Sequence, residues 1–335
     1  MVESLLRYLH TPHWKRQHRW RRAVWDAMNS VGLTGLHAAP LHRRWIEVHR
    51  RAMPLTNLDP NLDGLRLIQI SDLHYSPVVW KRYLQQLLDW VSDLEPDMVV
   101  VTGDLITGGY RYAPRIAAML ARIKCPLGVV CTFGNHDYSW YGKAQVIEGL
   151  RRADYLEKCL MERGLIVLRN QVMEIHPEQV KHRKSPAAGN GNGSRGKPLL
   201  VVGLDDAWSG NIDPPRAFAG VRRDCPVICL NHDPANCLEL MPYPWQWMLS
   251  GHTHGRQTAD SRIARRFSGR RQFTHGYYGV NGRHLYVNRG LSYGQRVKHW
   301  CRPEVTVFRL TRDDAARPGE ESIQVVPIAT GKPQA

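Results

Sequence analysis

The 335-residue sequence predicts an α/β protein built around a parallel or mixed sheet. Apolar runs rich in β-branched residues alternate with segments whose apolar residues recur at helical spacing. Five of these strand-like runs are followed within three residues by Asp, His or Asn. Because such sheets collect ligands beyond the carboxyl ends of their strands, these polar residues mark the expected functional site.

Strands and helices are expected to alternate from Leu65 onward. Residues at helical spacing precede Pro96, which favours a helix that ends before it. The expected elements are strand Leu65–Ile70, helix Tyr83–Leu94, strand 99–102, helix Pro114–Ile123, strand Leu127–Thr132, helix Ala144–Gly164 and strands Leu199–Leu204, Val227–Leu230 and Trp245–Leu249. A right-handed crossover between the first two strands would bring Asp72, His74 and Asp104 to the same sheet edge.

A short polar motif follows each of five strands. In chain order the motifs are Asp72-Leu73-His74, Gly103-Asp104, Gly134-Asn135-His136-Asp137, Asn231-His232-Asp233 and Gly251-His252-Thr253-His254. They offer oxygen and nitrogen donors without a thiolate, which suits Mn²⁺, Fe or Zn²⁺. Several such donors, with a carboxylate able to bridge, suit two metals held roughly 3.5–4 Å apart, as in phosphoryl transfer.

The five ordered motifs resemble those of the calcineurin-like metallophosphoesterases, over about Leu65 to Leu310. A second pattern, Val287-Asn288-Arg289-Gly290-Leu291 followed by Arg302-Pro303-Glu304-Val305, is similar to a subgroup of bacterial phosphodiesterases. That subgroup includes one type of UDP-2,3-diacylglucosamine pyrophosphatase. The resemblance implies an α/β fold of four layers, an α-β-β-α sandwich of two mixed sheets with a dinuclear metal centre at one sheet edge.

The sequence divides into three parts on this basis. We expect a basic amphipathic helical extension over residues 1–60, a catalytic domain over 61–315 and a disordered tail over 316–335. Within the domain, Leu165–Leu168 is expected to begin the second sheet. Residues 176–198 are rich in Lys, Arg, Ser, Gly, Asn and Pro, which predicts a flexible basic insertion loop.

The resemblance also implies roles for single residues. One metal would be held by Asp72, His74 and His254, the other by Asn135, His232 and His252, with Asp104 as the bridge. A hydroxide bound between the metals would attack phosphorus. His136 would stabilise a phosphoryl oxygen or protonate the departing oxygen, and Asp137 would orient it. Arg256 stands where related sequences carry Gly, so we expect it to add a contact to the substrate phosphate.

Composition limits the partners and the compartment. The formal net charge of +16 and the pI near 9.8 favour an anionic partner, such as a phosphorylated substrate, anionic lipid or nucleic acid. Seven cysteines at irregular spacings, with no Cys-x-x-Cys pair, argue against a disulfide framework and a thiolate metal site. A reducing cytoplasm fits this pattern best.

Residues 1–53 differ from the rest in charge and aromatic content. They contain ten Lys or Arg, three acidic residues and four tryptophans, but no apolar run long enough to span a membrane and no signal peptide. Two helical faces are expected, one with Trp20, Val24, Ala27, Met28 and Val31 and one with Leu41, Trp45, Val48 and Ala52. This pattern favours a peripheral anchor on the inner (cytoplasmic) membrane. Packing on the domain or on a second subunit is the alternative, and nucleic-acid contact is less favoured.

Two classes of enzyme and one class without activity remain open at this point. The first is a membrane-surface hydrolase like UDP-2,3-diacylglucosamine pyrophosphatase, acting on a nucleotide-linked glycolipid of lipid A synthesis. The second is a soluble phosphodiesterase or phosphatase for nucleotides or phosphoproteins. The third, a scaffold without catalysis, is disfavoured because all seven ligands and His136 are present.

Overall fold

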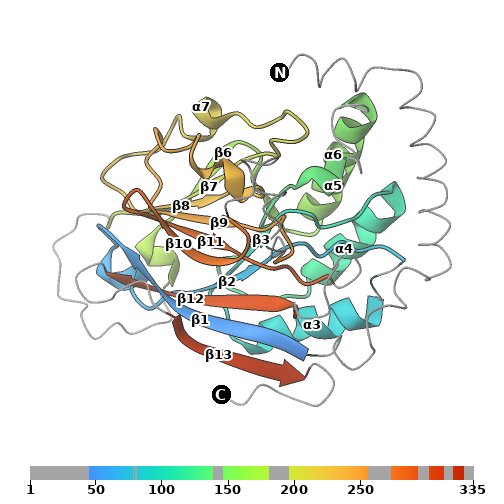
Figure 1. Cartoon of the computed structure of the whole chain (residues 1–335), viewed down its shortest axis with the longest axis horizontal. Coiled ribbons are helices and arrows are strands. Elements are labelled where there is room, and N and C mark those ends of the chain that lie inside the picture. The colour runs from blue at the N-terminus through green and yellow to red at the C-terminus, as the bar shows by residue number, and fades with distance from the viewer. Residues whose placement is uncertain are drawn as a thin grey trace, which may run out of the picture.

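Two mixed β-sheets form the centre of the molecule. The computed structural model describes residues 45–77, 79, 81–138, 146–180, 196–255, 273–292, 302–312 and 320–327. A seven-stranded sheet has the order β13-β1-β12-β2-β3-β4-β5, and a six-stranded sheet has the order β10-β11-β9-β8-β7-β6 (Figure 1). The expected α/β class and its two mixed sheets are therefore confirmed.

The strands of the seven-stranded sheet are β1 (Trp45–Leu55), β2 (Arg66–Ile70), β3 (Met98–Thr102), β4 (Val129–Thr132), β5 (Ile166–Val167), β12 (Glu304–Arg312) and β13 (Glu320–Pro327). Those of the six-stranded sheet are β6 (Gln171–Ile175), β7 (Leu199–Gly203), β8 (Val227–Leu230), β9 (Trp247–Ser250), β10 (Gly276–Val280) and β11 (Arg283–Val287). β2, β3 and β4 pair in parallel, as do β7, β8 and β9. The carboxyl ends of these strands therefore lie together within each sheet.

Helices cover the outer faces of both sheets. The helices are α3 (Lys81–Asp93), α4 (Ala113–Leu120), α5 (Asn135–Tyr138), α6 (Val146–Met161) and α7 (Pro214–Ala217), with 3-10 helices η3 (Pro60–Leu62), η4 (Tyr110–Tyr112), η6 (Pro177–Val180) and η7 (Pro234–Cys237). Figure 1 shows α3, α4 and α6 along one side of the molecule. Their buried side chains form one core with the outward residues of β2, β3 and β4, such as Ile68, Val99 and Val101.

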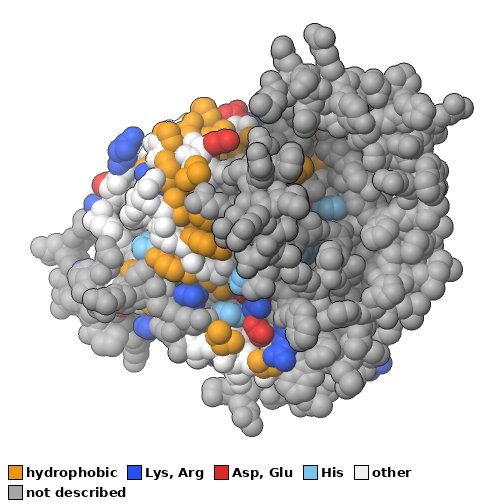
Figure 2. All heavy atoms as spheres, viewed as in Figure 1, with side chains coloured by type: hydrophobic (Ala, Val, Ile, Leu, Met, Phe, Trp, Pro, Cys, Tyr) orange, Lys and Arg blue, Asp and Glu red, His pale blue; other side chains and the backbone are white. Residues whose placement is uncertain are grey.

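A second core lies between the sheets, and a third lies under the short helices. Leu67, Val100 and Val130 of the first sheet pack with Val201, Leu249 and other residues of the second. α7 and η7 cover the outer face of the second sheet, but each has only four residues. Figure 2 shows hydrophobic side chains gathered on the face that carries α7 and β8 to β11. Among the residues that the structure describes, the four layers are thus unequal, since the longer helices lie on the seven-stranded sheet.

The helical face predicted over Leu41–Ala52 is wrong for the part that the structure describes. Residues 45–55 form β1, which pairs in parallel with β12 and antiparallel with β13. Ile46 and Val48 are buried against the helical layer, while Met53 and Leu55 reach the core between the sheets. The segment is therefore a strand, because β12 and β13 satisfy the hydrogen bonds of its main chain on both sides. Its side chains alternate between the two faces of the sheet.

Three further expectations differ from the structure. Residues 320–327 of the predicted disordered tail form β13, which pairs with β1. The strand predicted over Leu165–Leu168 pairs with β4 and so ends the first sheet, and β6 begins the second. The predicted insertion loop starts with the ordered turn η6, and Val180 packs against the core between the sheets.

Several predicted features fall outside the described residues. They include the helical face around Trp20, the glycine-rich part of the insertion loop at 189–194, and Arg256 with the arginines that follow it. Across the part of the chain that the structure describes, none of the helices has the length and apolar character needed to cross a membrane.

Candidate metal centre

The carboxyl ends of five strands bring the predicted ligands together. β2 leads to Asp72 and His74, β3 to Asp104, and β4 to Asn135, which begins α5. In the second sheet, β8 leads to His232, while β9 leads to His252 and His254. Main-chain hydrogen bonds connect neighbouring loops within each sheet. The Asp72 N–H donates to the Gly103 carbonyl in the first sheet and the Gly251 N–H to the His232 carbonyl in the second, each at 3.0 Å.

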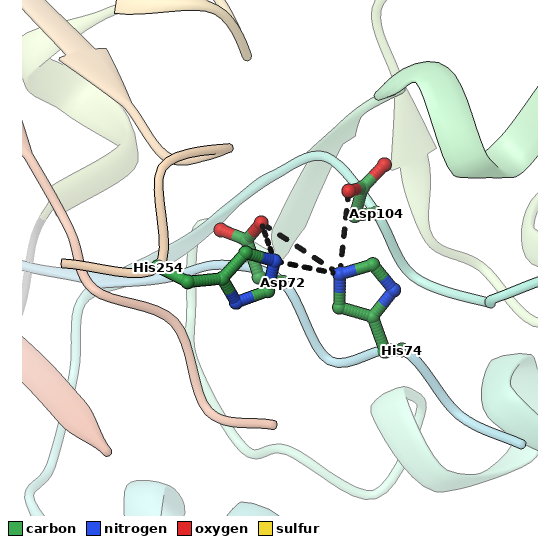
Figure 3. A group of neighbouring side chains, drawn as sticks. All are labelled: Asp72, His74, Asp104 and His254. Carbon is green, nitrogen blue, oxygen red and sulfur yellow. Dashed lines mark hydrogen bonds and ion pairs between the residues drawn. The ribbon is translucent and has the colours of Figure 1, made fainter. Parts of the chain in front are cut away.

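The first group of ligands is Asp72, His74, Asp104 and His254 (Figure 3). His74 Nε2 lies 3.0 Å from His254 Nε2 and 3.3 Å from Asp104 Oδ2. His254 Nε2 lies 3.4 Å from Asp72 Oδ1. Figure 3 shows the four side chains pointing toward one another, and all four are buried. Their ligand atoms thus surround one point.

The second group is Asp104, His232 and His252, so Asp104 belongs to both groups. His232 Nε2 lies 3.2 Å from Asp104 Oδ2, the same oxygen that faces His74. The Asn135 side chain joins this group through its Oδ1, 3.1 Å from His252 Nδ1. The structure therefore places all seven predicted ligands together, in the two sets expected, with Asp104 between them.

Burial sets the protonation of these side chains. Among protein groups alone, burial lowers the pKa of His74 to about 3 and that of His252 to about 4. Burial also raises the pKa of Asp72 to about 7. It opposes ionisation of Asp104, but the neighbouring histidines, led by His232, outweigh it and hold the pKa of Asp104 well below its usual range. Neutral His74 and His252 keep lone pairs for a cation.

The orientation of His232 tests whether a cation fits. His232 Nδ1 lies 2.7 Å from the Thr102 carbonyl oxygen, so this nitrogen donates, and in the neutral ring Nε2 carries the lone pair. That lone pair faces the buried Asp104 carboxylate. Burial disfavours a charged His232, yet Asp104, together with Asp72 and the Thr102 carbonyl, outweighs burial and holds the pKa of His232 well above its usual range. Positive charge is therefore favoured between His232 Nε2 and the Asp104 carboxylate. A proton on His232 supplies it in the protein alone, and the oxygen and imidazole donors suit a divalent ion in place of that proton.

Close approach explains the glycines of the motifs. A Cβ on Gly251 would lie 1.9 Å from Ser71 Oγ and 2.4 Å from Asp72 Oδ2. A Cβ on Gly134 would lie 2.4 Å from Asp104 Oδ1 and 2.6 Å from His232 Nε2. Any side chain at Gly251 or Gly134 would therefore displace the predicted ligands Asp72, Asp104 or His232.

His136 and Asp137 have different surroundings. The His136 ring is edge-on to the His74 ring, with centroids 4.8 Å apart, and it is hydrogen bonded to the main chain at Thr107. Asp137 was predicted to orient His136, but its two oxygens accept hydrogen bonds from the main-chain N–H groups of Ile106 and Gly134, at 3.1 and 3.0 Å. Its carboxylate therefore fastens the loops after β3 and β4 to each other.

The family model of the calcineurin-like phosphoesterases matches residues 65–256, a span that includes all five motifs. This chain belongs to the calcineurin-like phosphoesterase family. A metal-dependent phosphoric ester hydrolase is the activity that the family and the buried Asp and His cluster support.

Curated relatives are similar over most of their length. The chain is 29% identical over 331 residues to a UDP-2,3-diacylglucosamine pyrophosphatase, LpxG, of Chlamydia muridarum, covering 84% of this chain and 97% of the relative. It is 28% identical to the uncharacterized metallophosphoesterase YkuE of Bacillus subtilis, covering 82% and 88%. It is 26% identical to the phosphodiesterase YaeI of Escherichia coli, covering 79% and 88%.

Two residues of the site were missed by sequence reasoning. The main chain of Thr102 orients His232, a role that any residue can fill and that leaves no signal in the sequence. Trp208 lies beside His252, with ring centroids 5.3 Å apart. It lies two residues after Asp205-Asp206, which follow strand β7, and acidic residues after a further strand end are the signal that could have found this loop.

Proposed function

We propose that this chain hydrolyses a phosphodiester or pyrophosphate bond in a nucleotide-linked glycolipid such as UDP-2,3-diacylglucosamine, at a dinuclear metal centre. The observation that carries the reaction type is the sharing of Asp104 Oδ2 between two groups of buried ligands, at 3.3 Å from His74 and 3.2 Å from His232. A shared carboxylate of this kind suits two ions that act on one phosphoryl group.

In the proposed mechanism some residues hold the two ions and others position the loops or contact the substrate. When bound, two divalent ions supply positive charge for the phosphoryl oxygens and lower the pKa of a water molecule. Asp72, His74 and His254 would hold one ion, and Asn135, His232 and His252 the other. We propose Mn²⁺, with Fe or Zn²⁺ as alternatives.

His136 and Asp137 complete the proposed mechanism. His136, next to the ligand His74 in space, would stabilise a phosphoryl oxygen or protonate the departing oxygen. Asp137 would keep the Asp104 and Asn135 loops at a fixed separation through its two main-chain contacts. Arg256, outside the described residues, stays proposed as a contact to the substrate phosphate.

Similarity to LpxG supports the glycolipid substrate, since it extends over nearly the whole length of that relative. The sequence before β1 supports a membrane location. Residues 1–44 contain eight Lys or Arg, two acidic residues and three tryptophans, a composition suited to anionic headgroups. We propose that the chain acts in the cytoplasm, at the surface of the inner membrane.

Hydrolysis of UDP-2,3-diacylglucosamine in detergent micelles with Mn²⁺ tests the substrate. The same protein is assayed with bis(p-nitrophenyl) phosphate, and Asp104→Ala serves as the blank. Turnover of the lipid far above the model diester supports the proposal. Turnover of the diester alone would favour a phosphodiesterase with a soluble substrate. Absence of both activities in the Mn²⁺-loaded protein would contradict the proposed function.

Binding to vesicles tests the location. The full chain with Trp20 and Trp25 replaced by Ser is compared with the wild type on vesicles of anionic and neutral lipid. We expect weaker binding to anionic vesicles with unchanged hydrolysis of the model diester. Substitutions are preferable to a deletion through Met53, because such a deletion would remove most of β1. An insoluble or inactive variant would instead support packing of this segment on the domain.

A further inference from the structure

An exposed tryptophan lies at the edge of the metal centre. Trp208 follows β7 by five residues, and 48% of it is exposed, whereas Trp245 and Trp247 are buried in the core. Its ring lies beside the ring of His252, a predicted ligand, with the centroids 5.3 Å apart and the planes tilted by 43°. A large apolar surface is thus kept in solvent one side chain away from the metal ligands.

The protein holds this ring in place by its polar edge. Trp208 Nε1 donates to Asp233 Oδ2 at 2.7 Å, and the other oxygen of Asp233 accepts from the Ala235 N–H at 2.9 Å, which fixes it at the start of η7. The loop around the ring is closed by Asp206, whose Oδ2 accepts from the Ser209 N–H at 2.5 Å. With the indole N–H used inside the protein, the exposed remainder of the side chain is apolar.

We propose that Trp208 is a stacking residue for a nucleobase attached to the phosphate on which the metal centre acts. This inference rests on the proposed function and adds to it a residue that selects the substrate. A fixed aromatic ring suits a planar partner such as a nucleobase. Stacking tolerates any base, because every base has a π-face. A flexible acyl chain would gain less from a single exposed ring, since ordering the chain costs conformational entropy.

Substitutions separate stacking from a structural role of Trp208. Trp208→Ala removes both the ring and the hydrogen bond to Asp233. Trp208→Phe removes the hydrogen bond but keeps an aromatic face. Met161→Ala is the matched control, because Met161 is also a large exposed apolar residue, 60% exposed at the end of α6.

Calorimetric titration of the full-length Mn²⁺-loaded protein with UMP and with ribose 5-phosphate measures the contribution of the base. We expect UMP to bind roughly 5- to 150-fold more tightly than ribose 5-phosphate, the range for one stacked base. In Trp208→Ala this ratio should fall to near one. In Trp208→Phe most of the ratio should remain, and in Met161→Ala it should equal the wild-type ratio.

Two results would overturn this role of Trp208. One is a wild-type protein that binds both ligands equally, or neither. The other is a Trp208→Ala protein that keeps the wild-type ratio. Because the readout is binding, it separates from the proposed function: a normal UMP preference without hydrolysis of any diester contradicts the reaction alone. Hydrolysis of bis(p-nitrophenyl) phosphate with an unchanged ratio in Trp208→Ala contradicts the stacking alone.

Discussion

Replacing Arg289 with Met is expected to destabilise the fold strongly, because it leaves a buried carboxylate without its cation. Arg289 Nε donates to Glu304 Oε2 at 2.5 Å, and its Nη2 contacts both Glu47 and His49 of β1. Glu304 is 1% exposed, and burial opposes its ionisation, but Arg289, with His49 and Tyr286, outweighs burial and lowers the pKa of Glu304. Tyr286 donates to the other oxygen of Glu304, at 2.7 Å.

The expected loss of unfolding free energy is about 3–5 kcal/mol, the usual cost of removing one partner from a buried ion pair. Unfolding in urea, followed by circular dichroism, measures it. Arg122→Met is the matched control, because Arg122 also donates to a carboxylate, that of Asp89, through two hydrogen bonds of 3.0 Å each. That pair is about half exposed, with side chains 54% and 45% accessible, so its loss should cost about 1 kcal/mol or less.

A second variant tests the reason for the loss. Adding Glu304→Gln to Arg289→Met removes the buried charge, so the double variant should be more stable than the single one. The reasoning is refuted if Arg289→Met costs no more than Arg122→Met, or if the double variant is the less stable of the two. The segment that follows Arg289 contacts the Asp72 loop, since the Ser292 N–H donates to the Asp72 carbonyl at 3.0 Å. Loss of the Arg289 contacts should loosen this segment, so Arg289→Met should also bind metal more weakly.

Three further predictions concern the site and its support. His136→Ala should lower kcat for bis(p-nitrophenyl) phosphate by roughly 10²- to 10⁴-fold while metal content by mass spectrometry stays unchanged. Gly251→Ala should lower metal content, because its Cβ would lie 2.4 Å from Asp72 Oδ2 and displace that ligand. His49 and then Arg289 lower the pKa of Glu47 to about 2, from 4.5. Glu47 therefore stabilises the fold above about pH 4.5, and this contribution of roughly 1–3 kcal/mol is lost as the pH falls toward 2. The unfolding free energy of Glu47→Gln, measured in urea, should depend less on pH over that range.

Each of these three predictions has a contrary outcome. Loss of metal together with activity in His136→Ala would remove the role proposed for its ring in the reaction. A full complement of metal in Gly251→Ala would mean that the Asp72 loop relaxes around the new methyl group. Equal loss of stability on acidification in Glu47→Gln and in the wild type would mean that Glu47 contributes no charge interaction.

One rule accounts for the predicted ligands within each sheet. Parallel strands end at one edge of a sheet, so the polar residues after Ile70 and Thr102 meet in the first sheet and those after Leu230 and Ser250 meet in the second. The packing of the two sheets against each other brings both groups together. The two ligand sets and the bridging position of Asp104 came from the family resemblance, and the geometry brings the same residues together. Local pattern and long-range topology agree at this site.

The wrong assignments share another cause. The spacing of Trp45, Val48 and Ala52 fits one face of a helix, while Ile46 and Val48 equally fit one face of a strand. The choice is made by β12 and β13, more than 250 residues away in the sequence, which supply main-chain partners on both sides. Pairing over such a distance leaves no periodic signal. The same holds for Trp208, whose place beside His252 depends on the meeting of two loops.

Five of the seven predicted ligands have a left-handed backbone: Asp72, His74, Asp104, His252 and His254, with φ between 45° and 69°. Such residues cost roughly 1–3 kcal/mol each, and they persist where surrounding contacts determine the conformation. Here the contacts are hydrogen bonds donated by main-chain N–H groups between the predicted ligand loops, such as the His74 N–H to the Asp104 carbonyl at 2.9 Å and the His252 N–H to the Asp72 carboxylate at 3.1 Å. The loops thus hold one another in conformations that none would adopt alone. Predicted ligands held in this way would need little rearrangement to receive ions, and the left-handed backbone is concentrated at these residues.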